Sequence, residues 1–331
     1  MAGAALTRGA PRTARRALAG LLLLASLLLL VLVPMAGLYY VRIADDVLIY
    51  TLLAMGLNMV IGYAGLLDLG FVAFYAVGAY TYALLASPEF GIHLPFLVIL
   101  PMGVLLAAAF GILLGIPVLP LRGDYLAIVT LGFGEIIRLL LNNMDAVTGG
   151  PQGVMMIDAP RIAGYALLTP RGFYMLLLGL CVGVGTLVFR IERSILGKAW
   201  AAVREDQDAA RGVGINTTAV KLAAFATSAA VGGLAGVIFA SFQRYVSPES
   251  FTFNESILVV LIIVIGGVGN ILGVITGAIV LIVLPEVLRG VAQYRMLAFG
   301  TALSVLIVLR PQGLVPRGFG PSELWRLVWR G

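Results

Sequence analysis

Residues 190–221 read RIERSILGKAWAAVREDQDAARGVGINTTAVK, and this stretch decides how the rest of the chain is arranged. Nine of the residues from Arg190 to Arg211 are charged, in a chain that holds 22 Lys and Arg and 16 Asp and Glu. Long apolar runs precede and follow the stretch. Because charged side chains are costly to place in hydrocarbon, we expect the stretch to lie in water and the apolar runs to lie in a membrane.

A short amphipathic helix is predicted within this stretch. Ser194 can cap a helix that opens near Leu196, and Gly212 or Gly214 can end it. Arg204, Asp208 and Arg211, spaced four and three residues apart, would neutralise one another along one side. Beside them runs an apolar stripe that suits docking into a groove of a partner protein, formed by Leu196, Trp200, Val203 and Ala210.

The composition indicates an integral membrane protein. Of 331 residues, 61% are hydrophobic and 11% are charged, whereas soluble domains average about 25% charged residues. At about 20 residues for each crossing, the apolar segments predict an all-α polytopic membrane protein with about ten transmembrane helices. We place these helices near residues 17–33, 47–62, 66–86, 95–116, 125–143, 173–189, 221–241, 255–268, 271–288 and 295–309.

Lysine and arginine set the predicted orientation, because they collect on the cytoplasmic side of a membrane. With the N-terminus inside, 15 of these residues fall inside: four before residue 17, Arg122, six in residues 190–221 and four from Arg310 onward. The prediction is a basic cytoplasmic N-terminus (1–16), a transmembrane domain (17–310) that includes a cytoplasmic loop (190–220), and a cytoplasmic tail (311–331). The net charge of +6 therefore reflects topology and not nucleic-acid binding.

The first apolar run also resembles a signal peptide, because four arginines precede it. The segment after Pro34 offers a poor cleavage site, so we expect an uncleaved first span. The chain has one cysteine, Cys181, and one histidine, His93. This leaves almost none of the cysteine and histidine side chains that a metal site or a hydrolytic triad of a membrane enzyme requires. No cofactor and no metal is expected in this chain.

Two glycine-rich segments share the pattern V-I-G-x-x-G. They read VIGYAG at 60–65 and VIGGVG at 264–269, and each closes one expected span and opens the next. Similar interrupted segments in two halves of a chain indicate an internal repeat and a central transport path, although two ordinary tight turns would give the same letters. On the first interpretation Gly62, Gly65, Gly266, Gly267 and Gly269 lie along the path.

Polar residues inside the expected spans are further candidates for the path. Glu135, Arg138 and Asn142 follow one another at three and four residues and share one face of a helix. They form either part of the path or a polar clamp between helices. Asp68 lies between Gly65 and Gly70. It is either solvated at the cytoplasmic interface or, if the helix breaks there, turned to a cavity.

Two segments fall on the outer side in this orientation. One is TGGPQG at 148–153 and the other is YVSPES at 245–250. The first could receive a substrate-binding protein, although a turn-rich connector is common in membrane proteins.

Residues 208–214, with Asp-Ala-Ala followed after three residues by Gly214, resemble the EAA loop through which permease subunits of ABC importers couple to their ATPase. Aspartate replaces the usual glutamate, and the isoleucine expected about ten residues after the glycine is absent. The resemblance makes the helix an ATPase-coupling element, with contacts expected from Trp200, Val203, Arg204, Glu205, Asp206, Asp208, Ala209, Ala210, Arg211 and Gly214.

A longer series of motifs resembles the LivM-type permeases of branched-chain amino acid ABC importers. In order, they are LN at 57–58, GYAGLLDLG at 62–70, LRGDYLAIVTLGFGEIIR at 121–138, TGGP at 148–151, the EAA-like loop, SPESFTF at 247–253 and RPQGL at 310–314. Some relatives carry Ser-Leu-Gly-His where this chain has Asp-Leu-Gly-Phe at 68–71, and the family also includes permeases for urea and short-chain amides.

The resemblance implies a permease subunit of the bacterial inner membrane that imports leucine, isoleucine or valine. Its implied partners are a LivH-like second permease, two cytoplasmic ATPases that bind the ATP, a periplasmic amino-acid-binding protein and membrane lipid. The chain has no G-x-x-x-x-G-K-[ST] phosphate loop of its own. The alternatives are an ABC permease for urea or amides, and an ion-coupled transporter that would depend on Asp68 and Glu135.

Overall fold

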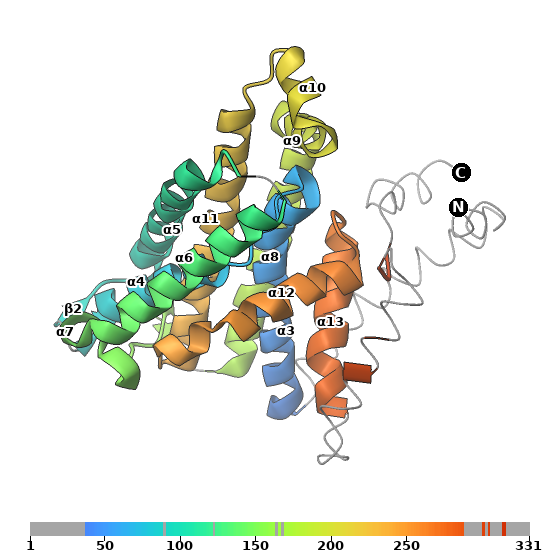
Figure 1. The fold of residues 1–331 in the computed structure, drawn as a ribbon. Coiled ribbons are helices and arrows are strands. Elements are labelled where there is room, and N and C mark those ends of the chain that lie inside the picture. The colour runs from blue at the N-terminus through green and yellow to red at the C-terminus, as the bar shows by residue number, and fades with distance from the viewer. Residues whose placement is uncertain are drawn as a thin grey trace, which may run out of the picture.

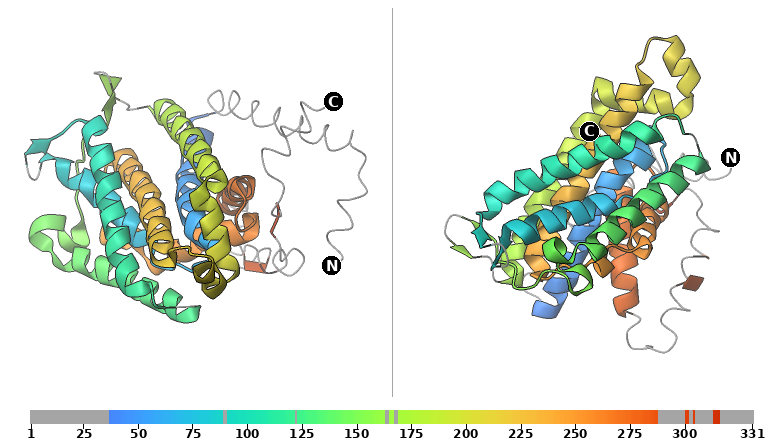
Figure 2. Two further views of the ribbon diagram at one scale, coloured as in Figure 1. Left: turned by 90° about the horizontal axis from the view of Figure 1, so that it is seen from above. Right: turned by 60° about the vertical axis from the view of Figure 1, so that its left-hand side comes forward.

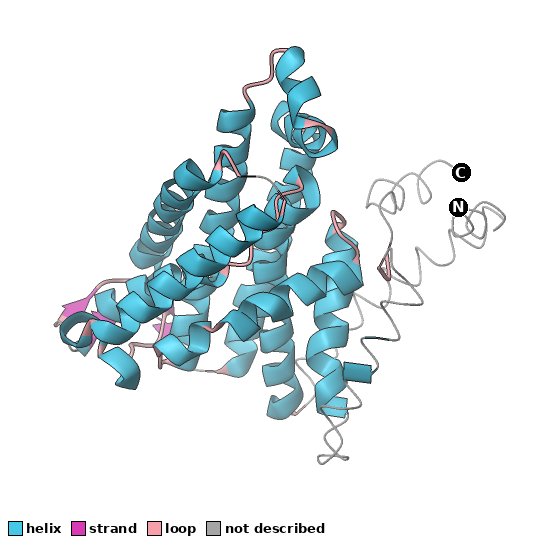
Figure 3. Ribbon diagram, viewed as in Figure 1, coloured by secondary structure: helices cyan, strands magenta, loops and turns pink. Residues whose placement is uncertain are grey.

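The computed structural model describes residues 37–88, 91–121, 123–162, 165–166, 169–287, 300–301, 304 and 313–315. These residues are mostly helical (Figure 3). The basic N-terminus (1–16), the expected span 17–33 and Arg122 lie outside the described residues. So do most of the expected span 295–309 and most of the tail 311–331.

Each expected span within the described part of the chain coincides with a helix. These helices are α3 (Leu38–Asn58), which continues as the π-helical turn η1 (Met59–Ala64), then α4 (Val72–Leu85), α5 (Phe96–Val118), α6 (Asp124–Asn143), α8 (Pro170–Arg193), α11 (Thr217–Gln243), α12 (Phe253–Gly266) and α13 (Ile271–Val287).

Two helix starts differ from the prediction. Helix α3 begins at Leu38 and not near residue 47, so Arg42, Asp45 and Asp46 lie inside it. Helix α4 begins at Val72 and not near residue 66, because the chain is non-helical between Gly65 and Gly70. Among the described residues, five helical segments are long and apolar enough to cross a membrane: Leu38–Ala64, Phe96–Val118, Pro170–Arg193, Thr217–Gln243 and Pro248–Gly266. Helices α4 and α13 are apolar but shorter.

Helices α3 and α11 form the centre of the bundle. Helix α11 packs against α5, α4 and α3, while α3 also packs against α8, α13 and α12. In the most apolar window of Leu38–Ala64, 78% of residues are buried, against 28% for Phe96–Val118. Close packing of α4 on α11 depends on Gly78 and Gly233, because a side chain on Gly78 would overlap the backbone of Gly233.

Short elements gather at the two ends of the bundle (Figures 1 and 2). One end carries α7 (Asp145–Thr148), η3 (Gly150–Gln152), η4 (Pro248–Phe251) and two hairpins. In the hairpins β1 (Ala86–Ser87) pairs antiparallel with β2 (Ile92–His93), and β3 (Arg161–Ile162) with β4 (Tyr165–Ala166). The opposite end carries α9 (Ile195–Glu205) and α10 (Gln207–Gly212), which project beyond the other helices.

Candidate functional site

The predicted helix in the charged loop is two helices. The Ser194 hydroxyl accepts a hydrogen bond from the Gly197 N–H and starts α9, as predicted. The chain is extended at Asp206, whose Oδ1 accepts hydrogen bonds from the N–H groups of Asp208 and Ala209, at 2.8 and 3.0 Å. Aspartate is a strong N-cap, so it begins the second helix α10. The prediction of one continuous helix was therefore wrong, although α10 does end at Gly212.

The apolar stripe of this loop faces its own chain. Trp200, Val203 and Ala210 are buried, and the Trp200 Nε1–H donates to the carbonyl of Val220 in α11 at 2.8 Å. Helix α9 packs against α8, α11 and η1. The expectation that the stripe is free to dock into a partner was wrong, because it attaches the loop to the bundle. The large apolar side chains of the loop that are exposed are Ile195 and Val213, at 87% and 79%.

The charged residues of the loop follow the prediction in part. Arg211 and Asp208 form an ion pair with an Nη1–Oδ1 distance of 3.6 Å. Arg204 lies before the break at Asp206, and its Nη1 donates to the carbonyl oxygen of Gly62 at 2.5 Å. Partial burial lowers the pKa of the Arg204 guanidinium, which remains charged. The exposed residues of the predicted coupling set are Arg204, Glu205, Asp206, Asp208, Ala209, Arg211 and Gly214.

The first glycine-rich segment ends α3 in the π-helical turn η1. Gly65 follows η1 in the left-handed region, with φ of 71°, and its N–H donates to the carbonyl of Val60. The side-chain stem of Arg204 lies over Gly65, where an added Cβ would be 2.5 Å from the arginine Cγ. The guanidinium and the stem of one residue in α9 therefore both contact this turn.

The second glycine-rich segment lies against the first. After α12 ends at Gly266, Gly267 and Gly269 have φ of 131° and 79° and form a non-helical turn. The N–H of Gly269 donates to the Asn58 Oδ1 at 2.8 Å, and an added Cβ on Gly62 would be 2.8 Å from the Gly269 nitrogen. The structure therefore places in contact two segments that the sequence related only through their shared V-I-G-x-x-G pattern.

The turn of the second segment also pairs with residues 313–315. The Leu314 N–H donates to the carbonyl of Ile265 at 2.7 Å, and the Val315 N–H to that of Gly266 at 2.9 Å. A Cβ on Gly313 would be 2.6 Å from the Gly267 Cα, so this approach requires glycine at residue 313, where φ is 81°. Part of the sequence RPQGL is therefore fixed against the second turn.

Asp68 lies in the non-helical segment between η1 and α4, and its side chain is fully buried. Its Oδ1 accepts a hydrogen bond from the Gly70 N–H at 2.9 Å, while its Oδ2 has no hydrogen-bond partner. The neighbouring Leu69 N–H donates to the Thr130 Oγ1 of α6 at 3.0 Å. Solvation at an interface therefore does not explain this carboxyl group, and the helix does break beside it.

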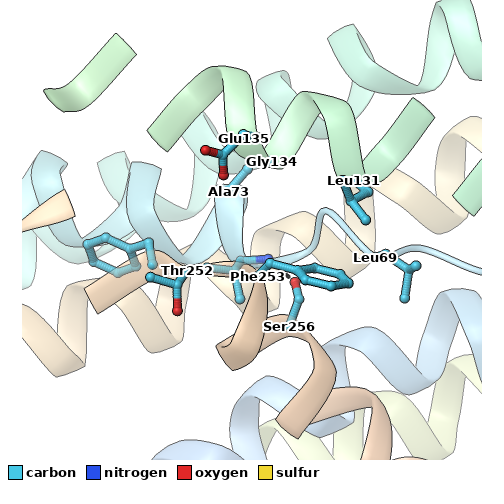
Figure 4. Close-up of a pocket in the computed structure, with 10 residues that line it drawn as sticks. Leu69, Ala73, Leu131, Gly134, Glu135, Thr252, Phe253 and Ser256 are labelled. Atoms are coloured by element: carbon cyan, nitrogen blue, oxygen red, sulfur yellow. Dashed lines mark hydrogen bonds between the residues drawn. The ribbon is translucent and has the colours of Figure 1, made fainter. Parts of the chain in front are cut away.

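A pocket of about 230 Å³ opens next to this segment (Figure 4). Glu135 of α6 and Ser256 of α12 lie on opposite sides of it. Its lining is mostly apolar and comes from the non-helical segment and the start of α4, from α6, from the end of η4 and from the start of α12: Leu69, Val72, Ala73, Leu131, Gly134, Glu135, Phe251, Thr252, Phe253 and Ser256.

Glu135 and Arg138 form the predicted pair. The Arg138 Nη2 lies 2.5 Å from the Glu135 Oε1, and its Nη1 lies 3.3 Å from the Glu249 Oε1 of η4. Arg138 therefore joins α6 to η4, while Glu135 also lines the pocket. Asn142 lies one turn further along α6.

The two expected outer segments form one surface. Val154 and Val246 exchange backbone hydrogen bonds of 2.8 and 3.1 Å, and the Tyr245 hydroxyl donates to the carbonyl of Gln152 at 3.2 Å. The Arg244 Nε–H donates to the carbonyl of Ile157 at 3.0 Å. Residues 150–157 and 244–251, far apart in the sequence, are therefore neighbours at the end of the bundle opposite α9 and α10.

Sequence reasoning missed a group of acids in the helices. Asp45 is fully buried in α3, and neither of its carboxylate oxygens has a hydrogen-bond partner. The Tyr50 hydroxyl of α3 donates to the Glu255 Oε2 of α12 at 2.8 Å. The sequence does hold a signal for the first of them, because Arg42 lies three residues before Asp45 and four before Asp46, a spacing that is compatible with a helix. Within the described residues, no three His, Cys, Asp or Glu side chains are grouped to hold a metal ion.

Comparison with known proteins gives consistent matches. Residues 39–310 match the protein family described as "Branched-chain amino acid transport system / permease component". The high-affinity branched-chain amino acid transport system permease proteins LivM of Salmonella typhimurium and Escherichia coli are each 45% identical to the chain over 299 residues, which cover 83% of this chain and 70% of each relative. The probable LivM permease of Methanocaldococcus jannaschii is 24% identical over 321 residues, covering 81% of this chain and 90% of that protein. No solved structure was found to match.

Proposed function

Because the chain belongs to the family of permease components of branched-chain amino acid transport systems, we propose that it forms the translocation path for leucine, isoleucine and valine in an ATP-driven importer of the bacterial inner membrane. The match over residues 39–310 is the observation that carries this proposal. The chain is a transport subunit, and ATP is bound and hydrolysed by partner subunits.

The orientation follows from the charged loop. We place α9 and α10 in the cytoplasm and the surface made by residues 150–157 and 244–251 on the periplasmic side. The described helices, with the apolar segments 17–33 and 295–309, would then make about ten crossings with both termini inside. The excess of Lys and Arg on the α9 side supports this assignment.

The coupling role belongs to the exposed side of α9 and α10. Trp200, Val203 and Ala210 hold the two helices on the bundle, so they support the coupling surface from beneath. The surface offered to an ATPase consists of the exposed members of the predicted set other than Arg204, which contacts Gly62, together with two exposed apolar residues: Ile195, Glu205, Asp206, Asp208, Ala209, Arg211, Val213 and Gly214.

The remaining partners and the path are assigned by position. A LivH-like permease would pair with this chain across its exposed apolar helix faces, which lipid covers elsewhere. A periplasmic amino-acid-binding protein would dock on the surface of residues 150–157 and 244–251. The path would pass the adjoining glycine turns, Asp68 and the pocket beside Glu135, where neighbouring protein shelters the interrupted helices.

Uptake of labelled leucine into proteoliposomes tests this function. The vesicles would hold the chain with its co-purified subunits, with binding protein outside and ATP varied inside. We expect uptake to require internal ATP and to be inhibited by unlabelled isoleucine and valine. Uptake without ATP would contradict the coupling, and ATP-driven uptake of urea but not of leucine would replace the substrate.

A pair of matched variants tests the coupling surface. Val213→Glu places a charge on an exposed apolar residue beside α10, and we expect the ATPase to be lost on co-purification. Met156→Glu makes the same kind of change at a residue that is 77% exposed at the opposite end of the bundle. It is expected to retain the ATPase, and equal retention by both variants would remove α9 and α10 from the coupling role.

A further inference from the structure

Arg204 is the residue through which the cytoplasmic loop reaches the glycine turns. Helix α9 lies above the end of α3 (Figure 1), and its Arg204 donates to the carbonyl of Gly62 while its stem covers Gly65. Trp200, one turn earlier, is bonded to α11 instead. The same short helix is therefore fixed to one central helix by its tryptophan and to the end of the other by its arginine.

We propose that Arg204 is a positioning residue that transmits movement of α9 to the π-helical turn η1 and, through Asn58, to the turn of the second glycine-rich segment. The inference rests on the proposed function, since it is the ATPase that would move α9. It adds the route by which that movement enters the helices.

The bond from Arg204 to Gly62 is well suited to transmit displacement. A guanidinium donor makes the bond charge-assisted, and such bonds are shorter and stronger than bonds between neutral groups. Its acceptor lies in a π-helical turn, where the backbone departs from the regular i to i−4 pattern and offers a carbonyl to an outside donor. The stem over Gly65 keeps the side chain in one place, so that a shift of α9 displaces the turn.

The second half of the route, from Asn58 and Gly62 to Gly269, is closely packed. Asn58 precedes η1 directly and accepts the hydrogen bond of the Gly269 N–H at 2.8 Å. Gly62 approaches Gly269 so closely that even a methyl group would not fit between them. Because packed interiors pass from one arrangement to another and do not deform continuously, movement of Gly62 must shift the second turn as well.

The experiment measures the ATP hydrolysed per labelled leucine imported by the full complex in proteoliposomes, together with retention of the ATPase. Arg204→Met removes the bond to Gly62, and we expect this ratio to rise by about 2- to 30-fold while the ATPase stays bound. Both side chains keep a stem over Gly65, but Arg204→Gln also retains a neutral N–H donor, so it is expected to raise the ratio less. Lys198→Met removes a positive charge from the exposed side of the same helix and is expected to leave the ratio unchanged.

Asn58→Leu tests the far end of the route. It should raise the ratio of ATP hydrolysed to leucine imported, as Arg204→Met does. The double variant of Arg204→Met and Asn58→Leu should have a ratio no higher than either single variant, because both changes interrupt the same route. Unchanged ratios in both Arg204→Met and Arg204→Gln would overturn the proposal, as would loss of the ATPase from these variants. Uptake by the unaltered complex that needs no ATP would instead contradict the proposed function.

Discussion

The segments VIGYAG at 60–65 and VIGGVG at 264–269 have almost the same letters and different structures. The first is a π-helical turn that ends at Gly65 in the left-handed region. The second leaves the helix at Gly266 and turns through two glycines of positive φ. The first receives a hydrogen bond from Arg204 of α9, whereas the second is held by the backbone of residues 314–315.

One position explains how the two segments fit together. Two residues before the shared pattern the first segment has Asn58, and the second has Ile262. The asparagine supplies the acceptor that the Gly269 N–H requires, and the isoleucine is buried without any polar group. Segments with similar sequences can therefore meet and still have unequal roles: one is attached to α9, and the other is attached to the first.

The largest effect is expected where the loop is anchored. Trp200 is fully buried, and its Nε1–H bonds Val220, so Trp200→Ala should lower the free energy of unfolding by about 3–5 kcal/mol. The variant would also release α9 from the first segment. Neither glycine-rich segment would then be attached to α9. Denaturation in mixed micelles measures the change. Ile195→Ala, at an exposed residue of the same helix, should change stability by no more than about 0.5 kcal/mol.

A methyl group added at the contact between the segments should lower the free energy of unfolding by less than Trp200→Ala does. In Gly62→Ala the new Cβ would overlap the Asn58 carboxamide and press on the backbone of Gly269. We expect a loss of about 1–3 kcal/mol in the free energy of unfolding. Gly132→Ala in α6 is the control, because a Cβ there meets no atom within 4 Å. If both variants were equally stable, the two segments would not be in contact.

Removing the acceptor tests the bond itself. Asn58→Leu leaves the Gly269 N–H buried without a partner, which should cost about 1–3 kcal/mol, and we expect the turn of the second segment to become the more mobile of the two. Hydrogen exchange at Gly269 reports this directly. Asn143→Leu, at an exposed asparagine at the end of α6, should leave that exchange rate unchanged.

The positions of the helices could be predicted from the sequence because apolar length alone determines them. Ser194 as the cap of α9 and the pair of Glu135 with Arg138 were also confirmed, since both depend on spacing within one helix. The break at Asp206 was missed because a capping aspartate and a helical aspartate have the same letter. The early start of α3 was missed because its first turns hold Arg42, Asp45 and Asp46, and the expected span covered only the apolar residues that follow them.

Contacts between distant segments could not be predicted in the same way. The two V-I-G-x-x-G segments suggested a repeat, but nothing in them required that they touch. The burial of Trp200 depends on α11, and the bond of Arg204 depends on where η1 ends. An apolar stripe outside the membrane has the same pattern whether it faces a partner or its own chain, and this is why the stripe on α9 was misassigned.

The smallest effect distinguishes the contact of Arg204 from the strain of the turn. Ala at Gly65 or at Gly214 would adopt a left-handed φ, so each variant should lose about 1–2 kcal/mol. Gly65→Ala should lose about 0.5–1.5 kcal/mol more, because its Cβ displaces the Arg204 stem and breaks the bond to Gly62, whereas a Cβ at Gly214 meets nothing within 4 Å. In an Arg204→Ala background both the stem and the bond are absent, and the excess should vanish. An excess that persists there would come from the turn alone, and Arg204 would then lie over Gly65 without stabilising the first segment.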